Sequence, residues 1–158
     1  TFKTCAIFCG NGYEWHGVKD VIDSLNSFPD IGLIVVGPFD IKSEKNILSL
    51  SFVESACLAS IIELCHFAIS TFRWDLIHIS HGSPLKSRQY LCHGCPIVVN
   101  YYDCAMDYTQ LHPYIIDFRS HAQDSFKQAA TLNYDKSNLK SLAQKLLSWD
   151  VYFKTIFS

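Results

Sequence analysis

The sequence predicts an α/β fold, in which a Rossmann-like, doubly wound parallel sheet of about six strands carries helices on both faces. Short, continuous apolar runs alternate along the chain with segments of helical periodicity. The connections are short, and no repeat, low-complexity tract or linker interrupts them. The length of 158 residues suffices for one domain with a sizeable core and is too small for two.

The first half of the chain supplies four of the predicted strands. Continuous apolar runs at 5–9 and 31–36 end at Gly10 and Gly37, which is typical of strands buried on both faces. Apolar side chains at helical spacing predict a helix over 18–25 between them. The other expected elements of this half are a strand at 47–50, a helix at 53–65 and a strand at 67–70.

The second half continues the alternation. Pro84 suits the first turn of a helix that runs to about His93, and Gly94 suits the position just after its end. Residues 73–82 remain open, either as an alternating strand or as an active-site loop. The remaining expected elements are strands at 96–99 and 114–118, helices at 122–130 and 139–146, and an aromatic-rich tail helix at 149–157.

Composition excludes some classes of function. A net charge of -2 provides no broad basic field to hold nucleic acid. No apolar run approaches the roughly 20 residues of a membrane-spanning helix, and the N-terminus lacks the pattern of a signal peptide. The absence of an initiator Met suits a piece of a longer protein. Seven Cys, an odd number and mostly within apolar runs, predict reduced thiols and a cytoplasmic location.

Parallel sheets of this kind bind ligands at the carboxyl ends of their strands. The loops expected to line one crevice there are 10–17, 37–40, 50–52, 71–72 and 81–86. In the last of these, the small residues Gly82 and Ser83 let a ligand approach the backbone, and the amides of the following helix start attract phosphate. Lys86 would add positive charge, and Gln89 on the same helix face could bond a ribose or sugar hydroxyl. The alternative is an ordinary proline-started helix with a solvated lysine.

Other groups favour neither a metal nor a cofactor. Cys92 and Cys95 form a Cys-x-x-Cys pair, but the pair ends a helix, where the dipole raises a thiol pKa, and no second pair completes a zinc site. His78 and His81 could bind a metal on a helix, but His81 alone facing a diphosphate is the better hypothesis. A tyrosine cluster is expected to form either an exposed patch for a partner or membrane surface, or loop packing; it comprises Tyr101, Tyr102, Tyr108 and Tyr114.

The block Ser83-Pro84-Leu85-Lys86-x-x-Gln89-Tyr90-Leu91-x-x-Gly94-x-Pro96-Ile97-Val98-Val99 resembles the donor site of glycosyltransferases of the GT-B fold. The rest of the chain follows the same order. Residues 10–17 resemble the loop after the first strand of that family's C-terminal domain, 31–37 resemble its next strand, and Trp149 resembles the tryptophan of its closing helix. The resemblance implies that 1–158 is the C-terminal, donor-binding domain of a two-domain enzyme.

Several positions differ from the common members of that family. Where retaining members carry two Glu eight residues apart, this chain has His81 and Gln89, and the basic residues of the first loop correspond to Asn11 and His16. The Lys-x-x-Gln pair resembles bacterial polysaccharide glucuronosyltransferases. That resemblance implies that Lys86 contacts the diphosphate and Gln89 the nucleoside or sugar.

The resemblance implies a glycosyltransferase that takes a nucleotide-diphosphate sugar, expected to be a UDP-sugar, and transfers a hexosyl or glucuronosyl group in polysaccharide or glycoconjugate biosynthesis. The glycan or lipid-linked acceptor would be held by an N-terminal domain outside this sequence, so no catalytic residue is assigned here and the chain alone is expected to be inactive. The whole enzyme is expected in the cytoplasm, at or near the inner membrane face. The donor-binding candidates are Gly12, His16, His81, Gly82, Ser83, Pro84, Leu85, Lys86 and Gln89.

The alternative function is a non-catalytic, doubly wound module that binds a nucleotide or a sugar phosphate. A response regulator would need carboxylates after its first and third strands, and none follows the expected strands at 5–9 and 47–50. A dinucleotide oxidoreductase would need Gly-x-Gly-x-x-Gly after the first strand. Gly10 and Gly12 begin that pattern, but the next glycine, Gly17, comes two positions late.

Overall fold

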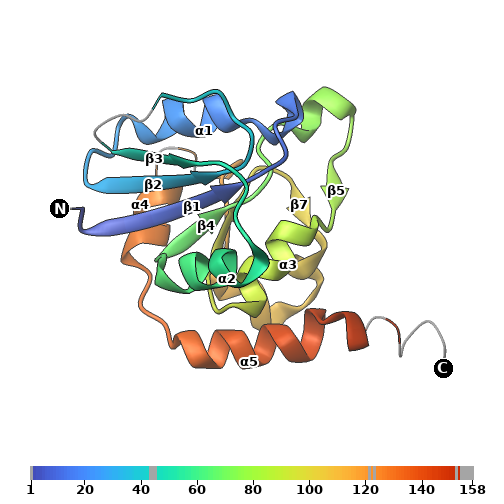
Figure 1. Ribbon diagram of the computed structural model, residues 1–158. Coiled ribbons are helices and arrows are strands. Elements are labelled where there is room, and N and C mark those ends of the chain that lie inside the picture. The colour runs from blue at the N-terminus through green and yellow to red at the C-terminus, as the bar shows by residue number, and fades with distance from the viewer. Residues whose placement is uncertain (1, 43–45, 121, 123, 152, 154–158) are drawn as a thin grey trace.

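The computed structural model describes residues 2–42, 46–120, 122, 124–151 and 153. Six parallel strands form one sheet in the order β3-β2-β1-β4-β6-β8, and helices cover both of its faces (Figure 1). The predicted α/β fold with a doubly wound, six-stranded parallel sheet is confirmed. Two further strands of two residues each, β5 (His81–Gly82) and β7 (Tyr102–Asp103), pair with one another in a second small sheet.

The strands of the main sheet are short and apolar. They are β1 (Thr4–Cys9), β2 (Ile31–Val36), β3 (Ile47–Leu50), β4 (Phe67–Ile69), β6 (Ile97–Val99) and β8 (Ile115–Asp117). Along β1, Ile7 packs into the core on one face, whereas Ala6 and Phe8 pack into the core on the other. This burial on both faces explains the continuous apolar run.

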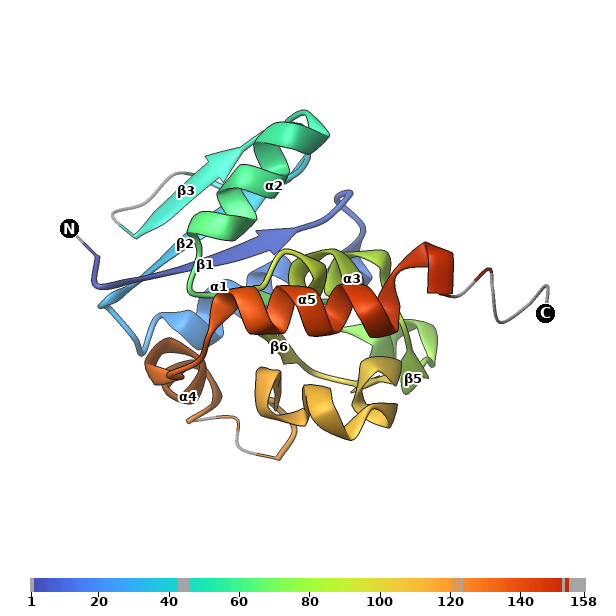
Figure 2. The same ribbon diagram turned by 90° about the horizontal axis from the view of Figure 1, so that it is seen from below.

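The helices form one layer on each side of the sheet. Helices α1 (Val18–Leu25) and α4 (Ser125–Thr131) pack on one face. Helices α2 (Ser55–Leu64), α3 (Leu85–Cys92) and α5 (Lys136–Leu147) pack on the other. Figure 2 shows α5 running alongside α3. Among the described residues, no helix is long and apolar enough to cross a membrane.

Some expected elements differ at their ends. The helix predicted over 139–146 begins earlier, because the Asp135 carboxylate caps α5 by accepting from the backbone N–H of Ser137 and Asn138. The helix predicted over 122–130 begins only at Ser125. The predicted tail helix is present at 149–151 and 153, and its other residues lie outside the described part of the chain.

Residues 73–82, for which the sequence allowed either a strand or a loop, form mainly a loop. Its first half is a 3-10 helix (Trp74–Ile77), which ends at His78 in a left-handed conformation with φ of 56°. Only its last two residues form a strand, β5. The apparent alternation of apolar and polar side chains here therefore did not indicate a long strand.

The strand order reverses direction at β1, because the chain continues from β1 to β2 on one side and later adds β4 on the other. The connections leaving β1 and β4 therefore diverge to opposite faces of the sheet. Such a switch point opens a crevice at the carboxyl ends of the strands. The fold thus identifies the loops after β1, β2 and β4 as the place for a ligand.

Candidate functional site

A pocket of about 480 Å³ lies at this switch point. Its wall combines the carboxyl ends of β1 and β2, at Cys9 and Val36, with Thr71 after β4. The start of α3 forms another side through Pro84, Leu85, Lys86 and Gln89. The crevice predicted from parallel strands is therefore present, and it receives the helix start that carries the Lys-x-x-Gln pair.

Lys86 is half-buried in the first turn of α3. Its Nζ donates a hydrogen bond to the Cys9 carbonyl at 2.7 Å and lies 4.8 Å from the centre of the Phe8 ring. Burial lowers the pKa of the Lys86 ammonium to about 7. The side chain is thus held inward against the end of β1, unlike a fully solvated lysine, and it can gain a proton near neutral pH.

The start of α3 also offers unpaired backbone donors. Pro84 precedes the helix with extended backbone, φ of −61° and ψ of 142°, and no side chain caps the first turn. The first amides of an α-helix have no partner within the helix, and they attract anions. Gln89 lies one turn beyond Lys86 and lines the same pocket. The backbone amides at the start of α3, the Lys86 ammonium and the Gln89 side-chain amide therefore lie around the same pocket.

His16 ends a short 3-10 helix (Glu14–His16) and is only 5% exposed. Its ring meets the edge of Trp15, with centroids 4.1 Å apart. Burial, aided by the positive charge of Lys86, lowers the pKa of His16 to about 4, so the imidazole is neutral at pH 7. His16 can therefore supply a hydrogen bond at the position where the resembling family has a basic side chain, but no charge.

Gly10 makes room for that histidine. A Cβ at Gly10 would lie 2.2 Å from His16 Nδ1 and 2.7 Å from the Phe39 ring. Within the described structure, His16 Nδ1 has no hydrogen-bond partner, and neither do the buried atoms Thr71 Oγ1 and Trp74 Nε1. An unpaired buried polar atom costs about 1–3 kcal/mol. All three residues line the pocket, where a bound polar group can reach them.

The structure places the other sequence candidates outside this pocket. Gly12, with φ of 87°, lines a neighbouring hollow with Pro38 and Arg73. His81 is exposed, and its Nδ1 shares a hydrogen bond with Ser80 Oγ at 2.7 Å. Gly82 and Ser83, the next two candidates, also lie outside the pocket lining. Gly82 leaves space for the Trp74 ring, and Ser83 Oγ accepts from Arg88 Nε at 2.7 Å.

A buried polar network behind α3 was not predicted. Tyr101 donates to Asp103 Oδ2 at 2.6 Å, and its hydroxyl lies 2.8 Å from the hydroxyls of both Ser70 and Ser87. Asp103 is fully buried, and burial raises its pKa. Tyr101, expected within an exposed aromatic patch or a packed loop, is 2% exposed and stacks near Trp74. The network joins the end of β4 to the first turn of α3.

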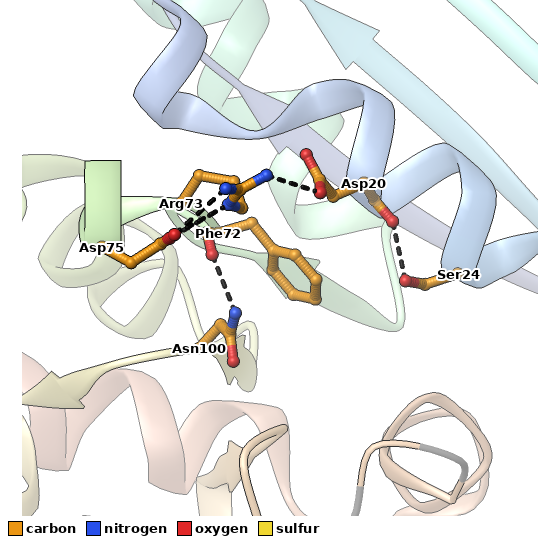
Figure 3. A network of polar contacts seen from close by, with 6 residues as sticks. All are labelled: Asp20, Ser24, Phe72, Arg73, Asp75 and Asn100. Atoms are coloured by element: carbon orange, nitrogen blue, oxygen red, sulfur yellow. Dashed lines mark hydrogen bonds and ion pairs between the residues drawn. The ribbon is translucent and has the colours of Figure 1, made fainter.

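Arg73 was also missed, although it borders the site. Its guanidinium bonds Asp20 on α1 and forks onto both oxygens of Asp75, all at 3.0–3.1 Å (Figure 3). Beside it, Asn100 donates to the Phe72 carbonyl at 2.8 Å. The contacts tie the loop after β4 to α1 and to the end of β6. Sequence gave no signal for them, because the partners lie 53 and 28 residues apart.

The Cys-x-x-Cys pair carries no sign of a redox or zinc role. Cys92 and Cys95 are free thiols, and burial raises the pKa of both, to about 12 for Cys95. Among the described residues, no group of three or more His, Cys, Asp or Glu side chains could hold a metal ion.

No protein-family model and no curated protein matches the chain. Solved structures of GT-B glycosyltransferases do match it. WaaG, a glycosyltransferase involved in lipopolysaccharide biosynthesis, is 13% identical over 98% of this chain and 46% of its own, with a TM-score of 0.69. Sucrose-phosphate synthase from Thermosynechococcus elongatus is 11% identical over 98% of this chain and 45% of its own, with a TM-score of 0.67. Anabaena HepE, solved in complex with UDP-glucose, is 13% identical over 100% of this chain and 50% of its own, with a TM-score of 0.59.

These likenesses define the class of fold. The chain has the Rossmann-like fold of one domain of the GT-B glycosyltransferases, and it spans half or less of the length of these three proteins. At 11–13% identity the agreement concerns the backbone architecture. What the pocket binds has to be argued from its own residues.

Proposed function

We propose that this chain is the donor-binding domain of a glycosyltransferase and that its pocket binds a nucleotide-diphosphate sugar. The observation that carries the proposal is the convergence of the uncapped start of α3, the Lys86 ammonium and Gln89 on a pocket at the switch point of the sheet. A helix N-terminus and a cation together suit a diphosphate. The structural neighbours add support, since HepE was solved with UDP-glucose and starch synthase IV from Arabidopsis thaliana with ADP.

In this proposal the protein contributes mainly position and charge. The diphosphate lies against the first turn of α3, and Lys86 turns from the Cys9 carbonyl to the phosphate oxygens. As the sugar leaves, the negative charge that develops on the diphosphate is stabilised by the same groups. The lipid-linked or glycan acceptor and the base that activates it belong to the rest of the enzyme, near the membrane face in the cytoplasm.

The charges around the pocket favour an uncharged hexosyl donor over a glucuronosyl donor. Among the described residues that line the pocket, Lys86 alone carries a formal charge. Nearby Arg73 is already held between two carboxylates, and Arg88 contacts Ser83 and lies 5.6 Å from the centre of the Trp149 ring. A sugar carboxylate would therefore lose water without gaining a cation, which costs free energy.

The first experiment is isothermal titration calorimetry of the chain with UDP, GDP, ADP and NAD. We expect UDP to bind in the micromolar to millimolar range, with Lys86→Ala weakening it about tenfold, since charge-assisted contacts contribute about 1.5–3 kcal/mol. Gln89→Ala should weaken it less. Lys127→Ala, which removes an exposed lysine on α4, is the matched control and should bind like the wild type. Undiminished binding by Lys86→Ala would refute the site.

A further inference from the structure

Two thiols meet at the amino ends of the strands, whereas the pocket lies at their carboxyl ends. Cys5 lies near the start of β1, and Cys65 follows the end of α2; their Sγ atoms are 3.9 Å apart. The backbone around them is fixed by two hydrogen bonds. His66 N–H donates to the Cys5 carbonyl at 2.8 Å, and Cys5 N–H donates to His66 Nδ1 at 3.1 Å. The contact between the sulfurs therefore follows from the pairing of β1 with the start of β4.

The two thiols differ in exposure. Cys65 is 1% exposed, whereas Cys5 is half-buried and lines a hollow of about 280 Å³ with Phe2, Gly32 and Leu48. A small reagent in solution can reach Cys5 first. The thiol of Cys65 donates a hydrogen bond toward Cys5, which lowers the pKa of Cys5. Cys5 is therefore the better nucleophile of the pair, because the thiolate is the reactive form.

We propose that Cys5 and Cys65 are a site of reversible oxidation, which a low-molecular-weight disulfide such as oxidised glutathione converts into an intramolecular disulfide. The Cys5 thiolate attacks one sulfur of the reagent, forms a mixed disulfide and releases the first thiolate. The hydrogen bond to Cys5 and burial raise the pKa of the Cys65 thiol, so the second step is the slower one. The reagent thiolate released first takes the Cys65 proton, and the Cys65 thiolate attacks Cys5 Sγ and releases the second reagent thiolate. Two protein thiols and one reagent disulfide thus become one protein disulfide and two reagent thiols.

The geometry needs only a small adjustment. A disulfide requires an S–S distance of about 2.05 Å, so the sulfurs must approach by roughly 1.9 Å, which side-chain rotation and a slight shift of α2 can supply. Helix α2 has a single fully buried residue, Ile62. Its end is held by Lys136, whose Nζ donates to the carbonyls of Glu63 and Cys65, so rotation of the two cysteine side chains supplies most of the approach. The bond would join the end of α2 to β1 and close a loop of about 60 residues, which restricts the unfolded chain.

The test is incubation of the native chain with oxidised glutathione, followed by alkylation of the remaining thiols, digestion and mass spectrometry. We expect one cross-linked species, the peptide of Cys5 joined to that of Cys65, and a rise in the thermal midpoint of roughly 5 °C that dithiothreitol reverses. Cys57→Ser, which removes an exposed thiol, should give the same cross-link. Cys65→Ser should retain glutathione on Cys5 as a mixed disulfide, and Cys5→Ser should give no cross-link.

Two results would overturn the proposal. One is a folded protein in which glutathione modifies Cys57 alone and no peptide contains both Cys5 and Cys65. The other is a cross-link between Cys65 and Cys95, a second buried thiol in the same core cluster. If Cys65→Ser does not fold, Cys5→Ser and the wild type still decide between these results, because Cys5 is half-buried at the rim of the hollow.

Discussion

In the proposed function, the chemistry of the pocket depends on Lys86. In the free chain its ammonium is paired with a neutral carbonyl and lies over an aromatic ring. Burial outweighs the smaller opposing effect of the Cys9 side chain and lowers the pKa of Lys86 to about 7. A bound diphosphate supplies that negative charge and favours the protonated form. Donor binding and protonation of Lys86 are therefore linked.

This linkage predicts that UDP binding takes up a proton between about pH 7 and pH 9. The free Lys86 is increasingly neutral above its pKa of about 7, so affinity should fall several-fold as the pH rises from 7 to 9. Calorimetry in HEPES and in Tris, which differ in protonation enthalpy, measures the uptake. Lys86→Arg keeps its charge throughout and should show neither effect. Wild-type binding without proton uptake would contradict the assignment.

Gly10 has no Cβ, and its absence leaves room for two neighbouring side chains beside the pocket. A Cβ there collides with His16 Nδ1 and the Phe39 ring, both partly or fully buried, so Gly10→Ala should lower the free energy of unfolding by about 1–3 kcal/mol and weaken UDP binding. Gly32→Ala is the matched control. The three atoms nearest to its Cβ all belong to the side chain of Phe2, which is 42% exposed and can move, so its cost should stay below about 1 kcal/mol. Urea denaturation compares the two, and equal costs would count against the packing argument.

Among single residues, Lys86, Gln89 and His16 could be placed in the site from sequence because they fall in or near recognisable blocks. Thr71 belongs to the loop at 71–72, which was also expected to line the crevice. Trp74 was not placed there, because 73–82 has no clear periodicity and the Trp74 ring contributes through burial.

At the scale of elements, strands were easier to predict than the contacts between them. A strand buried on both faces must be apolar at each position, so β1, β2 and β6 are visible as continuous runs. The strands β5 and β7 are two residues long and pair only with each other, which leaves no pattern to detect. The start of α5 depends on a cap, Asp135, that lies four residues before the first periodic leucine, Leu139.

The network of Tyr101 is what fixes α3 against β4. Tyr101→Phe removes a hydroxyl that serves Ser70, Ser87 and Asp103, and leaves a buried carboxylate without its shortest bond. We expect a loss of about 2–3 kcal/mol in the free energy of unfolding. Tyr102→Phe is the matched control, because that hydroxyl reaches exposed Asp107, and it should cost less than about 0.5 kcal/mol. Chemical denaturation distinguishes them; similar losses would mean that the buried network does not stabilise α3.

At the scale of the whole molecule, the chain offers one side of a site. Its pocket opens at the carboxyl ends of the strands, where β1, β2 and β4 end together with the start of α3. The chain spans half or less of the lengths of its matched structures. The proposed transfer would use residues outside this chain, whereas the proposed donor binding rests on residues within it. Binding specificity can therefore be measured on this chain.

The distribution of charge over the molecule predicts which donor it prefers. With Lys86 engaged by the diphosphate and Arg73 held by Asp20 and Asp75, the described residues that line the pocket leave no further cation for a sugar carboxylate. UDP-glucuronate should therefore bind at least about fivefold more weakly than UDP-glucose, a difference of about 1 kcal/mol. Calorimetry with UDP as the common reference separates the sugar from the nucleotide. Arg73→Gln is the control, because it would weaken UDP-glucuronate selectively only if Arg73 left its ion pairs for the sugar. Equal or tighter binding of UDP-glucuronate by the wild type would show that the pocket accommodates a second negative charge.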